Sequence, residues 1–125
     1  KRGIIVRYYG PVIFFAVLIF IVSSLPGPRI QSIDFNLNDK IAHCIEFGLF
    51  GILLYRMFKT AANVKHPFLA TVVTGLAYAA FDEIHQAFVP GRYSDITDFA
   101  ADAAGIILFG IVFVLVVRHR GKSNN

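Results

Sequence analysis

The sequence predicts an all-α integral membrane protein, a four-transmembrane-helix antiparallel bundle. Of its 125 residues, 56% are hydrophobic and only 16% are charged, which is more apolar than is usual for a soluble domain. Four apolar segments alternate with short polar connectors. At ~1.5 Å per residue, each segment forms a helix long enough to cross a hydrocarbon core ~30 Å thick. Connectors this short require consecutive helices to run antiparallel.

The four helices belong to one predicted membrane domain over residues 1–125. Their expected bounds are 8–25, 41–58, 67–89 and 96–117. The first segment is apolar almost throughout, so we expect it to close the bundle without supplying chemistry. The other three carry small residues, among them Gly48, Gly75 and Gly105, which allow membrane helices to approach closely.

Lysine and arginine are distributed unevenly between the two sides of the predicted bundle. Nine of the twelve lie at the start of the chain, in the second connector and at the end, and three lie on the opposite side, namely Arg29, Lys40 and Arg92. The positive-inside rule then places both termini in the cytoplasm. The basic ends are expected to contact anionic lipid head groups, and nucleic acid is not an expected partner.

All eight acidic residues fall in two stretches, 34–46 and 82–102, on the side opposite the basic ends. Eight acidic against three basic residues give that outer side a formal charge of −5. Ionisable groups at membrane depth indicate a functional site, because their desolvation is costly. Such a cluster must hold either protons or a cation.

Helical spacing predicts that the polar side chains of the last three helices form stripes at a common depth. The stripes are Asp39, His43 and Glu46; Tyr78, Asp82, His85 and Gln86; and Asp95, Asp98 and Asp102. Glu83 points about 100° away from Asp82 on the same helix, so it is expected to meet a different neighbour. We therefore expect one cavity that opens toward the outer leaflet.

Three of these motifs resemble the VanZ-like family. They are S-S-L-P-G at 23–27, D-K-I-A-H at 39–43, and D-E-I-H-Q-A-F-V-P-G-R at 82–92 followed by Asp98. The resemblance covers nearly the whole chain. It implies a small multi-pass protein of the bacterial cytoplasmic membrane, whose founding relative is linked to resistance to the glycopeptide teicoplanin. It implies no established reaction.

Residue chemistry predicts three kinds of role in the cavity. The expected acid–base residues are Asp39, His43, Asp82, Glu83, His85 and Asp98. The expected substrate-binding residues are Arg92, Gln86, Lys40 and Tyr78. The expected ligands of a divalent cation (Mg²⁺, Mn²⁺, Ca²⁺ or Zn²⁺) are Glu46, Asp82, His85, Asp98 and Asp102.

Four of these residues also have a structural interpretation. The two histidines can hydrogen-bond between helices, Arg92 can pair with Asp95 or Asp98, and Lys40 can extend toward the interface. A purely structural network is disfavoured, because interhelical hydrogen bonds in membranes average only ~0.6 kcal/mol while a central carboxylate costs about 2.5 kcal/mol to insert.

Three functions remain open from the sequence. The first is a metal- or acid–base-assisted enzyme that acts on a lipid-linked or phosphate-bearing envelope component. The second is a non-enzymatic protein that binds an amphiphile, an antibiotic or an envelope lipid. The third is a cation- or proton-linked transporter, which four unbroken helices favour least unless the chain forms an oligomer.

Overall fold

The structure, a computed structural model, describes residues 2–27 and 36–123, and the described chain is helical apart from its connectors. Lys1, Arg29 and Asp34, which are included in the charge totals above, lie outside the described residues. The elements are α1 (Arg2–Ile4), the π-helical segment η1 (Ile5–Tyr9), α2 (Gly10–Ser23), α3 (Leu37–Arg56), the π-helical segment η2 (Met57–Ala61), α4 (Pro67–Gln86) and α5 (Ile96–Ser123).

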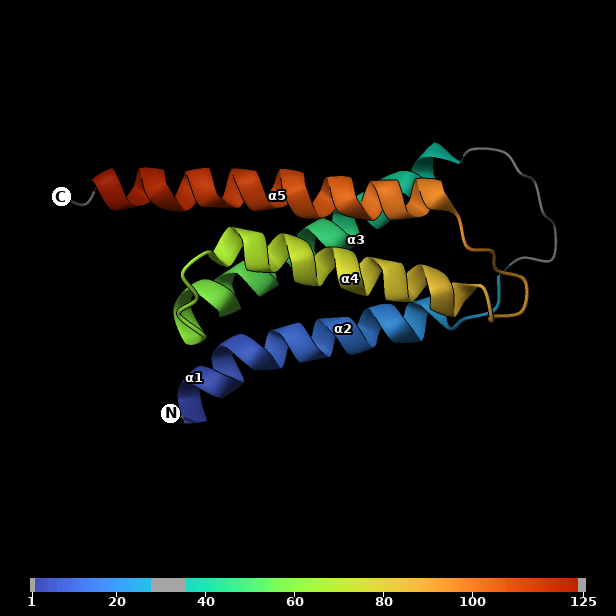
Figure 1. Cartoon of the computed structure of the whole chain (residues 1–125), viewed down its shortest axis with the longest axis horizontal. Coiled ribbons are helices and arrows are strands. Elements are labelled where there is room, and N and C mark those ends of the chain that lie inside the picture. Colours follow the sequence, from blue (N-terminus) through green and yellow to red (C-terminus); the bar gives the residue numbers. More distant parts are fainter. Residues whose placement is uncertain (1, 28–35, 124–125) are drawn as a thin grey trace.

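Four continuous helices are long and apolar enough to cross a membrane, which confirms the all-α four-helix membrane fold. They are Arg2–Ser23, Leu37–Ala61, Pro67–Gln86 and Ile96–Lys122. Figure 1 shows that they run alternately up and down, with the ends of α1 and α5 that lie nearest the termini at the same end of the bundle.

The predicted helix bounds are wrong by several residues in places, for local reasons. The second helix begins at Leu37 because the Asn36 side chain caps it, accepting hydrogen bonds from the backbone N–H groups of Asn38 (3.1 Å) and Asp39 (3.4 Å). The third ends at Gln86, three residues earlier than expected, where the chain turns toward Pro90. The first and fourth helices extend further toward the ends of the chain.

Close contact between α3 and α5 is the main packing interaction of the bundle. A Cβ atom on Gly105 would lie 2.0 Å from the backbone oxygen of Cys44, and one on Gly48 would lie 2.6 Å from the Phe109 ring. These glycines let the two backbones approach, as the sequence predicted for small residues.

The core is a band of apolar side chains between the helices. Phe47, Leu54 and Ile106 are fully buried, and the Phe47 ring packs edge-on against Phe50. Large apolar side chains such as Phe14 and Val112 are exposed, as expected for surfaces that face lipid.

Two connectors meet at the end of the bundle where α2 and α4 finish. The backbone N–H of Gly27 donates to the Pro90 carbonyl at 3.2 Å, and Gly91 adopts φ = 75°, a conformation that favours glycine. A Cβ atom on Gly27 would lie 2.1 Å from the Gly91 oxygen, so the crossing of these two connectors needs glycine at both positions. The contact holds the connector that follows α4 across the end of the bundle.

Candidate functional site

A histidine–carboxylate pair joins α3 to α5 just inside this end of the bundle. His43 Nδ1 lies 2.9 Å from Asp102 Oδ1, and both side chains are buried. With its proton on Nδ1, the imidazole donates to the carboxylate, which fixes the ring and leaves the Nε2 lone pair free. A base oriented by a second group in this way is the arrangement used for proton transfer.

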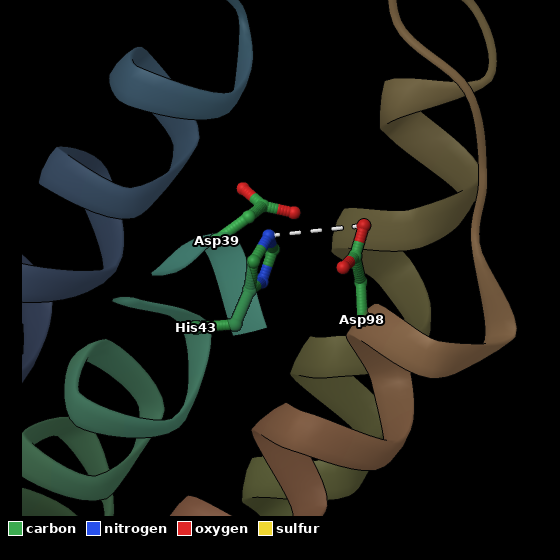
Figure 2. A group of neighbouring side chains, drawn as sticks. All are labelled: Asp39, His43 and Asp98. Atoms are coloured by element: carbon green, nitrogen blue, oxygen red, sulfur yellow. Dashed lines mark ion pairs between the residues drawn. The ribbon is translucent and has the colours of Figure 1, made fainter. Parts of the chain in front are cut away.

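Nε2 of the same ring faces the outer edge of the bundle. It lies 3.8 Å from Asp98 Oδ2, and Figure 2 shows Asp39 beside the pair on the α3 side. One ligand atom from each of Asp39, His43 and Asp98 lies within 4.8 Å of the other two. The three residues that the sequence placed on facing stripes of α3 and α5 therefore do converge.

Lys40 supplies the positive charge at this edge. Its ammonium lies 3.2 Å from Asp95 Oδ2, 3.4 Å from Asp39 Oδ2 and in contact with Asp98 Oδ1, and the Lys40 side chain is only 11% exposed. We call Asp39, Lys40, Asp95 and Asp98 the mouth group. Its lysine is an integral part of the site and not an interfacial side chain that reaches away from it.

Glu83 reaches the same site from α4. Its Oε2 accepts a hydrogen bond from the backbone N–H of Asp95 at 2.8 Å and lies 3.5 Å from the Ser94 hydroxyl. Its Oε1 is buried and has no hydrogen-bond partner in the described part of the chain. One ligand atom from each of His43, Glu83 and Asp102 lies within 4.8 Å of the other two. We call these three the buried group. Glu83 therefore meets Asp95, His43 and Asp102, which are different neighbours from the Gln86 partner of Asp82, as its position on the helix predicted.

The Asp82 stripe of α4 makes other contacts. Buried Asp82 accepts a hydrogen bond from Gln86 Nε2 at 3.0 Å, one turn along the same helix. His85 stacks on Phe20 of α2, with ring centroids 4.5 Å apart, and its Nε2 lies 2.8 Å from the Ser24 hydroxyl. Ser24 donates in turn to the Phe20 carbonyl, so His85 joins α4 to α2 and its contacts lie apart from the buried group.

The remaining predicted site residues do not join either group by hydrogen bonding in the described chain. Arg92 donates from Nε to the Leu25 carbonyl (2.9 Å) and from Nη2 to the Val22 carbonyl (3.3 Å), which caps the end of α2. The Tyr78 hydroxyl donates to the Ala16 carbonyl at 2.6 Å. Glu46 is half-buried on α3, and no hydrogen bond to its carboxylate is found within the described ranges.

Asp95 immediately precedes α5 and links the start of that helix to Lys40 of the mouth group. Its Oδ1 accepts from the backbone N–H and the hydroxyl of Thr97, both at 2.8 Å. These two hydrogen bonds, followed by the Lys40 ammonium, lower the pKa of the Asp95 carboxyl below its ordinary value. Asp95 therefore stays ionised and keeps Lys40 at the mouth.

An open surface groove of about 650 Å³ lies between α4 and α5. Its walls are Ala80, Ile84, Ile96 and Phe99, and Glu83, Ser94 and Asp95 line it as polar residues. An apolar groove with polar groups among its walls matches the general form of a site for an amphiphile.

The sequence interpretation did not assign a contact to the first span, and it gave Lys40 as a substrate-binding residue without pairing it with the carboxylates of the mouth group. Ser24, which meets His85, belongs to the S-S-L-P-G motif at the end of that span, so the motif itself was the available signal. Lys40 precedes His43 by three residues, a spacing that puts both side chains on one helix face.

Comparison with known proteins places the chain in a family. Neither the curated proteins nor the solved structures with which the chain was compared gave a match. The family model described as VanZ/LLP1 matches residues 8–118, which include most of the first and last spanning helices, all of the other two, and both groups of site residues. The chain belongs to the VanZ/LLP1 family.

Proposed function

We propose that this protein is a membrane-embedded acid–base enzyme that acts on a phosphate-bearing or lipid-linked component of the cell envelope in the outer leaflet. The observation that carries the proposal is the His43–Asp102 pair, with Nδ1 2.9 Å from the carboxylate and Nε2 directed to the mouth group. This geometry suits a base that takes a proton from an attacking hydroxyl or water and returns it to the leaving oxygen.

Lys40 is the residue that neutralises substrate charge in this proposal. Its ammonium sits between three carboxylates at the mouth, 3.2 Å from Asp95 and 3.4 Å from Asp39. A substrate phosphate oxygen that takes the place of one of these carboxylates would contact the Lys40 ammonium instead. Arg92, which the sequence favoured for the role, instead has two of its guanidinium nitrogens bound to carbonyls at the end of α2.

The groove beside Glu83 supports an amphiphilic substrate. Its apolar walls lie on the lipid-facing side of α4 and α5, where Ile84 and Ile96 are exposed. A hydrocarbon chain in this groove would bring its polar end to Ser94 and Asp95. The same groove also favours a second function, in which the protein binds an amphiphile without converting it.

The charge distribution and the family support the proposed cellular setting. The nine-to-three bias of lysine and arginine supports a bacterial cytoplasmic-membrane protein with cytoplasmic termini and an outward-facing mouth. In that orientation the site meets envelope precursors, and a change in those precursors would alter susceptibility to teicoplanin.

The test compares His43→Gln with His119→Gln, a control that removes an exposed histidine at the far end of α5. Membranes from cells that produce each variant are incubated with envelope lipids, and products are identified by mass spectrometry alongside teicoplanin susceptibility. We expect His43→Gln to abolish product formation and any protection, and His119→Gln to retain both. Protection that persists in His43→Gln without a lipid product would contradict catalysis and favour the binding function.

A further inference from the structure

We infer that the buried group, His43, Glu83 and Asp102, binds one divalent cation with one ligand from each of α3, α4 and α5. The inference deepens the proposed function and rests on it for the cation's part in catalysis. Two carboxylate oxygens carry it: among residues 2–27 and 36–123, which the structure describes, Glu83 Oε1 and Asp102 Oδ2 are buried without hydrogen-bond partners. Glu83 is 5% exposed and Asp102 is fully buried, so bulk water does not satisfy these oxygens.

The contrast with the mouth group shows why a cation is needed inside. At the mouth, Asp98 and Asp95 share the Lys40 ammonium. Within the described part of the chain, neither Glu83 nor Asp102 has a lysine or arginine nitrogen within 4.0 Å, and His43 is the only basic group that pairs with either. Two buried carboxylates on neighbouring helices, with one neutral or singly charged imidazole between them, lack compensating charge.

The spacing of the three ligands fits a small cation after modest side-chain rotation. Their ligand atoms lie within 4.8 Å of one another, whereas ligands of one divalent ion at ~2.1 Å are about 3 Å apart. Two carboxylates and one imidazole suit Mn²⁺ or Zn²⁺ better than Ca²⁺, which takes more oxygen ligands. The ligand set shares only Asp102 with the set expected from sequence.

A bound cation would also set the proton position on His43. The neutral ring carries one proton, so coordination through Nδ1 would require that proton to move to Nε2, which lies 3.8 Å from Asp98 Oδ2 at the mouth. In the cation-bound form His43 would therefore act as the proton donor to the leaving oxygen, and a water held by the cation would replace it as the proton acceptor.

The test titrates the purified full-length chain, in detergent micelles and stripped of metal, with Mn²⁺ alone and follows it by electron paramagnetic resonance. We expect one Mn²⁺ per chain and an affinity at least ~100-fold weaker in Glu83→Gln and Asp102→Asn, since loss of a ligand exceeds the effect of losing an outer-shell partner. Glu46→Gln is the matched control, a half-buried carboxylate of α3 outside the group, and should bind within about threefold of wild type.

A second signal comes from the folded wild-type chain and does not depend on the stability of the carboxylate variants. The bound Mn²⁺ should show magnetic coupling to one imidazole nitrogen, which disappears in His43→Gln and remains in His85→Gln. Absence of stoichiometric binding, equal affinity in Glu83→Gln and wild type, or coupling that follows His85 would each overturn the inference. A proton shared between Glu83 and Asp102 would produce the first of these results.

The cation site and the proposed enzyme can fail separately. Stoichiometric Mn²⁺ binding that depends on Glu83, with no lipid product with or without metal, would leave the site in place and contradict the enzyme. Product formation that depends on His43 and is unchanged by chelation and by Glu83→Gln would contradict the cation and leave the enzyme.

Discussion

Individual residues at the mouth divide into one cation, Lys40, and three carboxylates. Lys40 lies one turn before His43 on α3 and contacts Asp39, Asp95 and Asp98. It therefore links the start of α3 to the start of α5. The charge of the site depends on this side chain as much as on the acids.

Replacing Lys40 by Met should destabilise the protein, because Asp98 would remain buried without its partner. We expect a loss of roughly 1–3 kcal/mol in unfolding free energy, below the value for fully buried pairs because Asp39 and Asp95 are partly exposed. Unfolding of the detergent-solubilised protein, followed by helical circular dichroism, measures the change. Lys65→Met, at an exposed lysine of the opposite connector, should have little effect. Equal stability of the two variants would show that the mouth ion pairs contribute nothing.

Asp95 should make α5 sensitive to acid. Because its folded pKa lies below the ordinary value of 3.8, its contribution is fully present above that pH and is lost as the pH falls through the folded pKa. The Thr97 hydrogen bonds cap the helix, so Asp95→Ala should cost about 0.5–2 kcal/mol near neutral pH. Melting temperatures of wild type and Asp95→Ala, measured across this range, should converge under acid conditions. A constant difference down to the lowest pH would contradict the assignment.

The contact between α3 and α5 determines the site at the level of helices. The histidine of the buried group lies on α3, and its Asp102 partner lies on α5. Gly105, one turn beyond Asp102 on the same helix, lies against the backbone of Cys44, the residue after His43. A close approach of the two helices therefore lies beside the His43–Asp102 pair.

Gly105→Ala should separate these helices and weaken the site. Its Cβ atom would lie 2.0 Å from the Cys44 oxygen, a clash that backbone movement must relieve, at about 1–3 kcal/mol. Thermal unfolding should show the loss, and Mn²⁺ binding should weaken with it. Gly121→Ala, where no atom lies within 4 Å of the added carbon, is the matched control. A Gly105→Ala variant as stable as this control would contradict the close contact.

The whole molecule is polarised between its two ends. The end that holds the site carries the acidic residues, and the opposite connector and the chain ends carry most lysines and arginines. The terminal ends of α1 and α5 lie at the same end of the bundle (Figure 1). The basic ends of the chain therefore lie together, opposite the acidic end that holds the site. The positive-inside rule predicts that the site faces outward.

Cysteine labelling tests this orientation. In a Cys44→Ser background, Ser94→Cys and Ala62→Cys place single thiols at exposed positions on opposite ends of the bundle. A membrane-impermeant maleimide added to intact cells should label position 94 alone, and permeabilised cells should show labelling at both. Labelling of position 62 alone in intact cells would reverse the topology.

Composition, segment length and helical periodicity determined much of this protein without a structure. Four apolar runs of sufficient length predicted the four-helix membrane bundle, because the cost of exposing backbone groups to lipid leaves few alternatives. The 3.6-residue period correctly aligned Asp39 with His43 and Asp98 with Asp102. Both properties are local and need no knowledge of neighbours.

Only the tertiary structure decided which polar face of each helix enters the site. Periodicity relates residues within one helix, but the rotation of that helix about its axis is set by packing against others. On α4 that rotation directs Glu83 toward His43 and Asp102, and directs His85 toward Ser24 and Phe20 of α2. The reach of Arg92 to the end of α2 likewise depends on the Gly27–Gly91 crossing, a contact between segments more than sixty residues apart. Long-range packing thus places Lys40 at the mouth and directs Arg92 elsewhere. It likewise places Glu83 in the buried group and directs His85 away from it.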